Sequence, residues 1–210
     1  MKPLKQILLI SLLLLTAACD DDDEPEAVAP LEAQIANDIP ANPQPPGPPT
    51  GALPDYTLFS FETGAIVADS DSTTTNWDIG LSGLSIIVNG GVSGPGSTEA
   101  QILTGLFDEI TTAPENGYAS DTAEGTAIPT GSGNGWYNYN LNGNNVVTPI
   151  PGRVIVIRTN DGNYAKFEIL NYYKGNPDVT TAEFIDFNTR PPGRYYTFKY
   201  VYQPNGSRDF

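Results

Sequence analysis

The chain has 210 residues, with 10 basic and 25 acidic side chains, a net charge of −15 and no histidine. This charge repels nucleic acid and anionic lipid, so we expect no nucleic-acid partner. Without histidine there is no Ser-His-Asp triad, HExxH zinc motif or imidazole base. Paired carboxylates, such as Asp78 with Asp108, leave a glycosidase as the remaining catalytic alternative. We therefore expect a protein that is not an enzyme and holds no metal ion by its own side-chain cluster.

Residues 1–18 have the pattern of an export signal. Lys2 and Lys5 precede an apolar run, Ile7 to Leu15, which is too short to span a bilayer of roughly 30 Å. Small residues then lead to Cys19, which resembles the lipobox of bacterial lipoproteins. A lone cysteine in an exported protein has no disulfide partner, and acylation removes that difficulty. We expect Cys19 to be lipidated, with an ordinary cleaved signal as the alternative.

Residues 19–54 are predicted to be a tether. Asp20 to Glu24 form an acidic run, which is generically a solvated tail. Placed after a lipidated cysteine, the run resembles an export tag for the bacterial cell surface. Prolines recur between residues 40 and 54, a composition that favours extended chain over a packed core. We expect the lipid alone to hold the protein in the outer membrane, with surface exposure preferred over the periplasmic face.

Residues 55–210 are predicted to form one domain built mainly from short strands. In its first half, apolar and aromatic residues alternate with polar ones, and glycine-rich turns separate the runs. The expected strands there are residues 56–61, 65–68, 77–81, 84–88 and 102–110, the last with a short helix as the alternative.

A hairpin is predicted in the second half. Arg153 to Thr159 and Asn163 to Tyr173 are rich in β-branched and aromatic residues, and Asn160-Asp161-Gly162 separates them. Asp-Gly tolerates the positive φ of a tight turn. Ala165, Phe167 and Ile169 are expected on one face, with Lys166 and Glu168 on the other. With a last strand at 195–203, the pattern predicts an all-β antiparallel sandwich with at most one short helix, or a sheet-rich α+β variant.

The aromatic run before the hairpin is the main candidate for ligand binding. Trp136, Tyr137 and Tyr139 lie in a segment rich in glycine and asparagine, residues 131–145, whose loops we expect to be exposed. Aromatic faces beside amide groups suit a flat porphyrin, and equally the faces of sugar rings. The alternative is that Trp136 and one tyrosine belong to the core.

Basic residues after Cys19 all lie beyond residue 152. Residues 19–152 contain 19 acidic and no basic side chains, whereas residues 153–210 contain 6 acidic and 8 basic ones. One interpretation is that the acidic excess simply keeps the protein soluble. The other is that the basic residues after position 152 form the one cationic patch available to an anionic ligand. That patch would consist of Arg153, Arg158, Lys166, Lys174 and Arg194.

Several segments together resemble a known family. They are Trp136 to Tyr139, Val146 to Pro149, Val154 to Lys166 and Ile169 to Tyr173. In this combination they resemble the HmuY family of haem-binding outer-membrane lipoproteins. The resemblance covers the chain from about residue 55 onward. It implies an all-β fold, surface lipidation, haem capture for iron acquisition and delivery to an outer-membrane receptor.

The resemblance also implies an unusual mode of haem binding. Family members hold the iron through histidine, or methionine in some relatives, but this chain has no histidine and only Met1. Asn145 and its neighbour Asn144 stand where many family sequences carry histidine. A tyrosinate is a known haem ligand, or the ring is clamped without one and its propionates meet a basic side chain. The candidate residues are Trp136, Tyr137, Tyr139, Asn145, Tyr118 and Arg153. The alternative function is a surface module of the same fold that binds glycan or protein.

Overall fold

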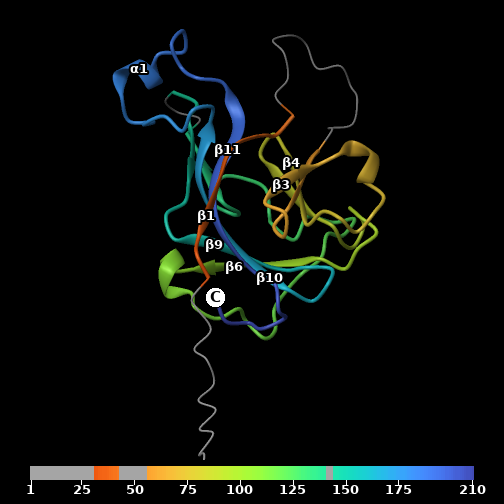
Figure 1. Ribbon diagram of the computed structural model, residues 1–210. Helices are drawn as coiled ribbons and strands as arrows, with labels where there is room; N and C mark the ends of the chain where they lie inside the picture. The colour runs from red at the N-terminus through yellow and green to blue at the C-terminus, as the bar shows by residue number, and fades with distance from the viewer. Residues whose placement is uncertain (1–30, 43–55, 141–143) are drawn as a thin grey trace, which may run out of the picture.

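The computed structural model describes residues 31–42, 56–140 and 144–210 (Figure 1). These residues form three antiparallel sheets, so the predicted all-β architecture is confirmed. The α-helix within the described part of the chain is one short turn, α1 (Ala182–Ile185). Two 3₁₀ turns, η1 (Asp69–Asp71) and η2 (Phe107–Glu109), also connect strands.

The larger sheet has five strands and contains the predicted hairpin. Residues 159–163 connect β9 (Arg153–Arg158) to β10 (Tyr164–Tyr173), and Gly162 in this turn has a φ of 77°, which glycine adopts without strain. The last strand, β11, pairs with β10 on its other side, as the alternation at residues 195–203 predicts. The sheet order is β1 (Gln34–Pro40), β11 (Gly193–Gln203), β10 (Tyr164–Tyr173), β9 (Arg153–Arg158) and β6 (Glu99–Thr104).

The second sheet has four strands, and a small two-stranded hairpin contacts β10 of the larger sheet. The order of the four-stranded sheet is β3 (Ala65–Val67), β2 (Thr57–Ser60), β4 (Ile79–Ser82) and β5 (Ser85–Val88). The hairpin consists of β7 (Tyr137–Tyr139) and β8 (Val147–Pro149). The segment predicted as a strand over residues 102–110 divides at Thr104, where β6 ends, and continues into η2.

The core lies where the five-stranded and four-stranded sheets face each other. Phe59 from β2 meets Phe198 from β11 edge to face, with 5.2 Å between the ring centres. Phe167 from β10 packs on Phe198 at 5.7 Å. Each ring is almost completely buried, and burying such a side chain stabilises the fold by about 1.5–3 kcal/mol. The alternation along β10 and β11 therefore places their aromatic faces toward the second sheet.

Strand β1 differs from the sequence prediction. Residues 34–40 lie inside the predicted tether, 19–54, but they pair with β11 along the edge of the large sheet. Ala36, Ile39 and Ala41 from this segment are buried. Because these few apolar residues stand among polar ones and prolines, local composition alone does not reveal the strand. Cys19 and residues 43–54 of the tether lie outside the described residues.

Lys166 lies on the face of β10 that points away from the core, but its side chain is not exposed to solvent. Only 4% of the residue is exposed, and its Nζ donates to the carbonyl oxygens of Phe107 and Ile110, both at 2.8 Å. Burial lowers the pKa of its ammonium group. The outer face of the sheet is covered here by η2 and by the last residue, Phe210, whose ring centre lies 5.2 Å from Nζ.

The two ends of the large sheet differ in what they carry. Gln34 pairs with Tyr200, and Leu31 packs in the same apolar cluster as Phe210, so the described chain enters beside the C-terminus. At the other end, β10 leads through α1 into β11. Figure 1 shows α1 at the end of the molecule opposite the C-terminus. The sheet thus separates an end that holds both described termini of the domain from an end built by the β10–β11 connection.

Candidate functional site

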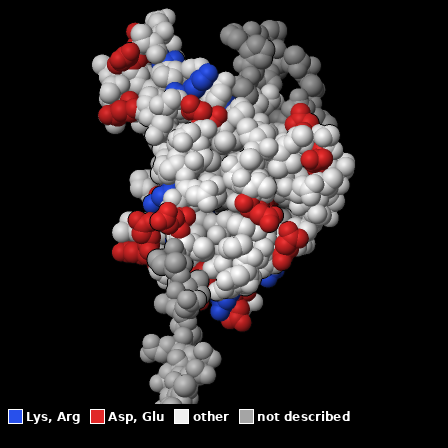
Figure 2. All heavy atoms as spheres, in the orientation of Figure 1, with Lys and Arg blue, Asp and Glu red and all other residues white. Residues whose placement is uncertain are grey.

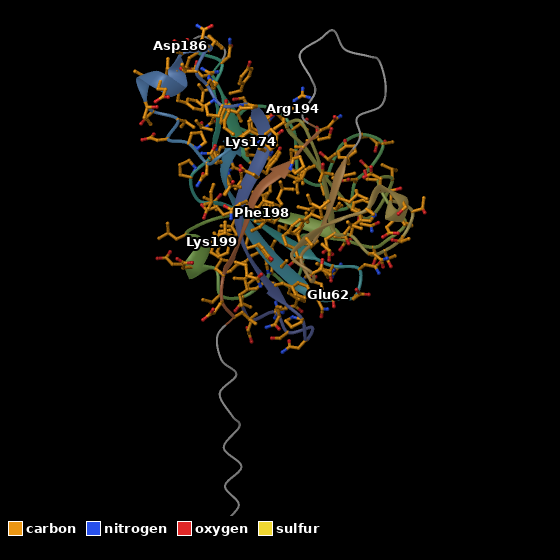
Figure 3. The ribbon with its side chains drawn as sticks, turned by 45° about the horizontal axis from the view of Figure 1, so that its top comes forward. Glu62, Lys174, Asp186, Arg194, Phe198 and Lys199 are labelled. Carbon is orange, nitrogen blue, oxygen red and sulfur yellow. The ribbon has the colours of Figure 1, made fainter. Side chains whose placement is uncertain are left out.

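A pocket of about 710 Å³ lies where β10 ends and β11 begins. This volume falls within the range of about 300–1000 Å³ that is typical of small-molecule sites. Aromatic rings and two guanidinium groups dominate the lining. These lining residues are Tyr139, Tyr172, Tyr173, Arg190, Arg194 and Tyr195. Figure 3 shows Lys174 and Arg194 at this end of the sheet, away from Lys199.

An irregularity in β10 brings Tyr172 and Tyr173 together. The pairing with β11 shifts register on both sides of Asn171, as in a β-bulge. The Asn171 Oδ1 accepts from the backbone N–H groups of Tyr172 and Tyr173, at 2.8 and 2.9 Å, and so stabilises the bend. Two consecutive tyrosines are therefore both buried in the core, although a regular strand would turn one of them away.

Tyr172 forms the inner wall of the pocket. It is 7% exposed and packs against Trp136 and Tyr196, with ring centres 5.8 and 5.5 Å away. The Tyr172 ring also packs closely on the backbone of Gly193, where a Cβ would lie only 3.0 Å from the ring. Burial raises the pKa of Tyr172 to about 12, and the nearby charge of Arg194 opposes that rise. Tyr172 is therefore a neutral phenol at physiological pH.

Tyr173 and Tyr139 connect the pocket to the β7–β8 hairpin. The Tyr173 Oη accepts from the backbone N–H of Val147 at 2.9 Å, and burial raises the pKa of its phenol. Tyr139 lies on β7 and is half-buried, so its ring is accessible from the pocket. The two tyrosines are 34 positions apart in the sequence. They meet at the pocket because Val147, which pairs with Tyr139 in the hairpin, donates its N–H to Tyr173 on β10.

Arg194 has an unusual backbone conformation. Its φ is 67°, in the left-handed region that residues other than glycine seldom adopt. It stands at the start of β11, its carbonyl accepts from the Ala41 N–H at 2.8 Å, and its Nη1 donates to the Asn42 carbonyl at 3.0 Å. Such strain of about 1–3 kcal/mol persists where the surroundings hold it and often marks functional sites. Here it presents a guanidinium group to the pocket beside Tyr172.

The structure places the predicted ligand residues unequally. Tyr139 and Asn145 line the pocket. Trp136 is only 2% exposed, its Nε1 donates to the Leu84 carbonyl at 3.2 Å, and its ring lies against Tyr137 and Tyr196. Tyr137 is 6% exposed, and its Oη accepts from the Gly131 N–H at 3.0 Å. Trp136 and Tyr137 thus match the alternative that they are core residues behind the pocket, and Trp136 offers no free face to clamp a ring.

Two predicted ligand residues lie away from the pocket. Tyr118 packs beside Tyr164, the first residue of β10, with the Arg158 guanidinium 5.3 Å from its ring centre. Tyr164 and Tyr172 are eight positions apart, which is about 26 Å along a strand. Burial raises the pKa of Tyr118 to about 12. Arg153, at the start of β9, points to the carbonyls of Gly133 and Asn134 at 3.4 and 3.5 Å.

The predicted cationic patch does not form as a single surface. Lys166 is buried under η2, and Arg158 is paired with Glu99. Lys174 and Arg194 remain near the pocket, with Lys174 Nζ 5.3 Å from the centre of the Tyr195 ring. Figure 2 shows the basic side chains near the α1 end lying among acidic ones. Positive charge at the pocket is therefore local: Arg190 and Arg194 line it, and Lys174 lies beside Tyr195.

Sequence reasoning did not single out Tyr172, Tyr173, Tyr195 or Arg190 as site residues. The first two were part of the family-like segment Ile169 to Tyr173, which was the available signal. Arg190 precedes Pro191-Pro192 and carried no signal of its own. These residues reach the pocket through a bulge and a loop, neither of which follows from strand periodicity.

Tyr139 also lines a second hollow, of about 460 Å³. Neutral polar side chains dominate it, among them Asn138, Asn140, Asn144 and Thr148.

Within the described residues, no group of three or more histidine, cysteine, aspartate or glutamate side chains is placed to hold a metal ion. The described part of the chain also contains no helix with the length and apolar character needed to cross a membrane.

The fold and pocket define a class of protein: an antiparallel β-sandwich with a pocket lined by aromatic residues at one end of its larger sheet. The sequence matches the family model described as HmuY protein over residues 52–188. The chain therefore belongs to the HmuY family. No curated protein matches the sequence.

Solved structures of low sequence identity share the fold. One is a Bacteroides vulgatus protein described as HmuY-like and haem-binding, with a TM-score of 0.50 and 16% identity over 82% of this chain and 93% of that one. Another is apo PinO from Porphyromonas gingivitis, with a TM-score of 0.51 and 13% identity over 82% of this chain and 98% of that one. At these identities the likeness concerns the fold.

Proposed function

We propose that the protein binds haem or a related porphyrin in the pocket at the β10–β11 end, without histidine ligation and without catalysing a reaction. The observation that carries the proposal is the pocket of about 710 Å³, lined by tyrosines and arginines, in a chain of the HmuY family. The haem-binding description of the Bacteroides vulgatus protein supports the same ligand class.

The pocket residues fit the parts of a haem. Tyr139, Tyr172 and Tyr195 offer aromatic surface for a flat ring. Arg194 supplies a guanidinium group, which suits a propionate carboxylate. Phenol oxygens are the iron ligands that the pocket offers, since the chain lacks histidine and has methionine only at position 1. Haem supplies the iron that the proposed uptake would deliver.

Tyr139 is a better candidate for an axial ligand than Tyr172 or Tyr173. The Tyr173 oxygen already accepts a hydrogen bond from the Val147 N–H, and Tyr172 would have to lose a proton that burial holds with a pKa of about 12. Tyr139 is half-buried and faces the pocket. Tyr118, proposed as a ligand on sequence grounds, packs beside Tyr164, which is about 26 Å along β10 from Tyr172, so it serves as a matched control.

An absorption titration of the purified protein with ferric haem tests the proposal. We expect a saturable Soret shift at micromolar haem. Tyr139→Phe should change the spectrum of the complex if its phenolate binds the iron, whereas Tyr118→Phe should leave it unchanged. Iron-free protoporphyrin should still bind in either case. The absence of saturation in the unmodified protein would sink the proposal.

The same proposal extends to the cellular setting. Residues 1–18 would be removed, Cys19 would carry the lipid, and the residues between Cys19 and β1 would tether the domain at the outer-membrane surface. The support is the sequence pattern around Cys19 and the acidic run after it. Haem would pass to an outer-membrane receptor for iron acquisition. Metabolic labelling with palmitate, lost in Cys19→Ala, and protease accessibility on intact cells test the anchor and the exposure.

A second candidate function is recognition of a neutral glycan or a protein surface. The observation that favours it is the hollow of about 460 Å³ beside Tyr139, where amide and hydroxyl groups dominate. Such groups satisfy the hydroxyls of a sugar, and an aromatic face packs on its ring. Glycan-array binding that Asn138→Ala abolishes would support it. An empty array together with haem saturation would retire it.

A further inference from the structure

We infer that the two arginines of the pocket have different roles: Arg190 is a positioning residue that holds the pocket rim, and Arg194 recognises the anionic group of the ligand. The Arg194 half rests on the proposed function, whereas the Arg190 half concerns the protein without ligand. The hydrogen bonds of the two guanidinium groups carry the distinction.

The guanidinium of Arg190 is committed to backbone carbonyls. Its Nε donates to Phe184 at 2.9 Å, and its Nη2 donates to Ile185 at 3.1 Å, both from the α1 segment. The same Nη2 donates to Asn144 at 2.8 Å, and Nη1 donates to Asn145 at 3.4 Å. Four of the five N–H groups of an arginine are thus in use. Arg190 therefore joins the α1 segment to residues 144–145, which precede β8.

Aromatic packing holds this guanidinium in place. Its Cζ lies 4.5 Å from the centre of the Phe187 ring and 5.1 Å from that of Phe184. Phe184 is buried and packs edge to face on Tyr173 at 4.6 Å, so the α1 segment is itself anchored to the pocket wall. Thr181 caps α1 by accepting from the Phe184 N–H at 3.2 Å. Phe187 is 64% exposed, and its ring covers the arginine.

Arg194 has donors to spare. Its Nη1 donates to the Asn42 carbonyl at 3.0 Å, and its charge acts on the Tyr172 phenol inside the pocket. Within the described part of the chain, the ion pairs are Arg158 with Glu99 and Lys199 with Asp108, so no carboxylate there neutralises Arg194. A carboxylate of a ligand can therefore form charge-assisted hydrogen bonds with it.

The two roles respond differently to lysine. An ammonium group is a compact point charge and cannot reproduce a planar fork that donates to four carbonyls. Lysine should therefore fail to replace Arg190. At Arg194 a point charge suffices for a carboxylate, so lysine should retain most of the affinity. Glutamine at either position removes the positive charge and so tests whether the role of that arginine requires it.

Hydrogen exchange on the full chain without ligand tests Arg190. We expect both Arg190→Gln and Arg190→Lys to raise amide exchange in residues 144–149, where the Val147 N–H bonds to Tyr173, while Arg194→Gln does not. Phe187→Ala, which removes one covering ring and no hydrogen bond, should raise it less. This variant keeps the test decisive if Arg190→Gln does not fold. Unchanged exchange, or full rescue by lysine, would overturn the Arg190 role.

Binding of iron-free protoporphyrin and of its dimethyl ester tests Arg194. Arg194→Gln should weaken the dicarboxylate by about tenfold or more and leave the ester nearly unchanged, because only the free acid offers a charged partner. Arg194→Lys should restore most of the loss. The Arg190 variants should weaken both ligands by the same factor. An equal loss of both ligands in Arg194→Gln overturns its role. If the unmodified protein binds neither porphyrin, the proposed function and the Arg194 role fail together, while hydrogen exchange still decides Arg190.

Discussion

Asp78 is a carboxyl group held almost inside the sandwich. It is 7% exposed, and its Oδ2 accepts from the Phe61 N–H at 2.7 Å. Burial raises the pKa of Asp78 to about 6, the Phe61 hydrogen bond opposes the rise, and the charges of Asp161 and Glu62 add to it. The ionised carboxylate is therefore unfavourable in the folded protein relative to the unfolded chain.

The pH dependence of stability follows from this pKa. The pKa of Asp78 in the folded protein exceeds the ordinary value of 3.8. Its contribution to the free energy of unfolding is therefore fully present below about pH 4 and is lost as pH rises through 6. Asp78→Asn keeps an oxygen for the Phe61 N–H and cannot ionise. We expect it to raise the free energy of unfolding at pH 7.5 by roughly 1–3 kcal/mol, and to have little effect near pH 4.

Urea unfolding of the native chain and Asp78→Asn at several pH values checks this expectation. Asp108→Asn is a suitable control, because the Asp108 side chain is 83% exposed and its pair with Lys199 lies at the surface. Exposed ion pairs contribute about 0–1 kcal/mol. Identical pH slopes in the native chain and Asp78→Asn would contradict the role assigned to Asp78.

At the scale of elements, β1 completes the larger sheet. It pairs with the outer edge of β11 from Gln34 opposite Tyr200 to Pro40 opposite Tyr195, with an irregularity between Ala36 and Ile39. The Tyr200 Oη donates to the Gln34 Oε1 at 2.8 Å, which adds a side-chain contact at one end. The strand covers an edge of the sheet that would otherwise leave backbone groups unpaired.

A truncation series tests the contribution of β1. A chain that starts at residue 55 lacks the strand and exposes the β11 edge, whereas one that starts at residue 31 keeps it. We expect the shorter chain to lose several kcal/mol of stability and to melt roughly 10 °C lower or more, from the burial and hydrogen bonds lost. Thermal melting followed by circular dichroism measures the difference, and coincident melting curves would show that β1 is dispensable.

At the scale of the whole molecule, the pocket and the chain entry lie at opposite ends of β11. Gln34 pairs with Tyr200, whereas Arg194 at the pocket is six residues earlier. That separation is about 20 Å along the strand. The proposed tether would therefore attach at the end beside the C-terminus and leave the pocket facing away from the membrane.

This orientation predicts that anchoring does not obstruct binding. With the lipidated protein on vesicles, we expect porphyrin affinity within about twofold of the affinity of the Cys19→Ala protein in solution, because the pocket lies at the far end of the domain. Fluorescence quenching of the porphyrin on both forms measures it, with vesicles alone as the blank. A strong loss of affinity on vesicles would place the pocket next to the membrane instead.

Local patterns were sufficient for most of the strands and their turns, but they did not reveal β1 and they extended β6 beyond Thr104. The runs at residues 153–159 and 163–173, with Asn160-Asp161-Gly162 between them, predicted β9 and β10 to within one residue at the turn. Family-like segments from Trp136 to Tyr173 predicted the family and the all-β fold. The site was predicted in part: Tyr139 and Asn145 line the pocket, but Trp136 is buried behind it and Tyr118 lies elsewhere.

The sequence by itself therefore determined most of the strands, the hairpin turn and the family, because these depend on neighbours a few residues apart. Only the tertiary structure decided which side chains meet. Trp136 is covered by Tyr196, sixty positions later, and the pocket joins Tyr139 to Arg194 through a bulge at Asn171. Contacts between residues so distant in the chain arise from sheet packing, which periodicity along one strand cannot reveal.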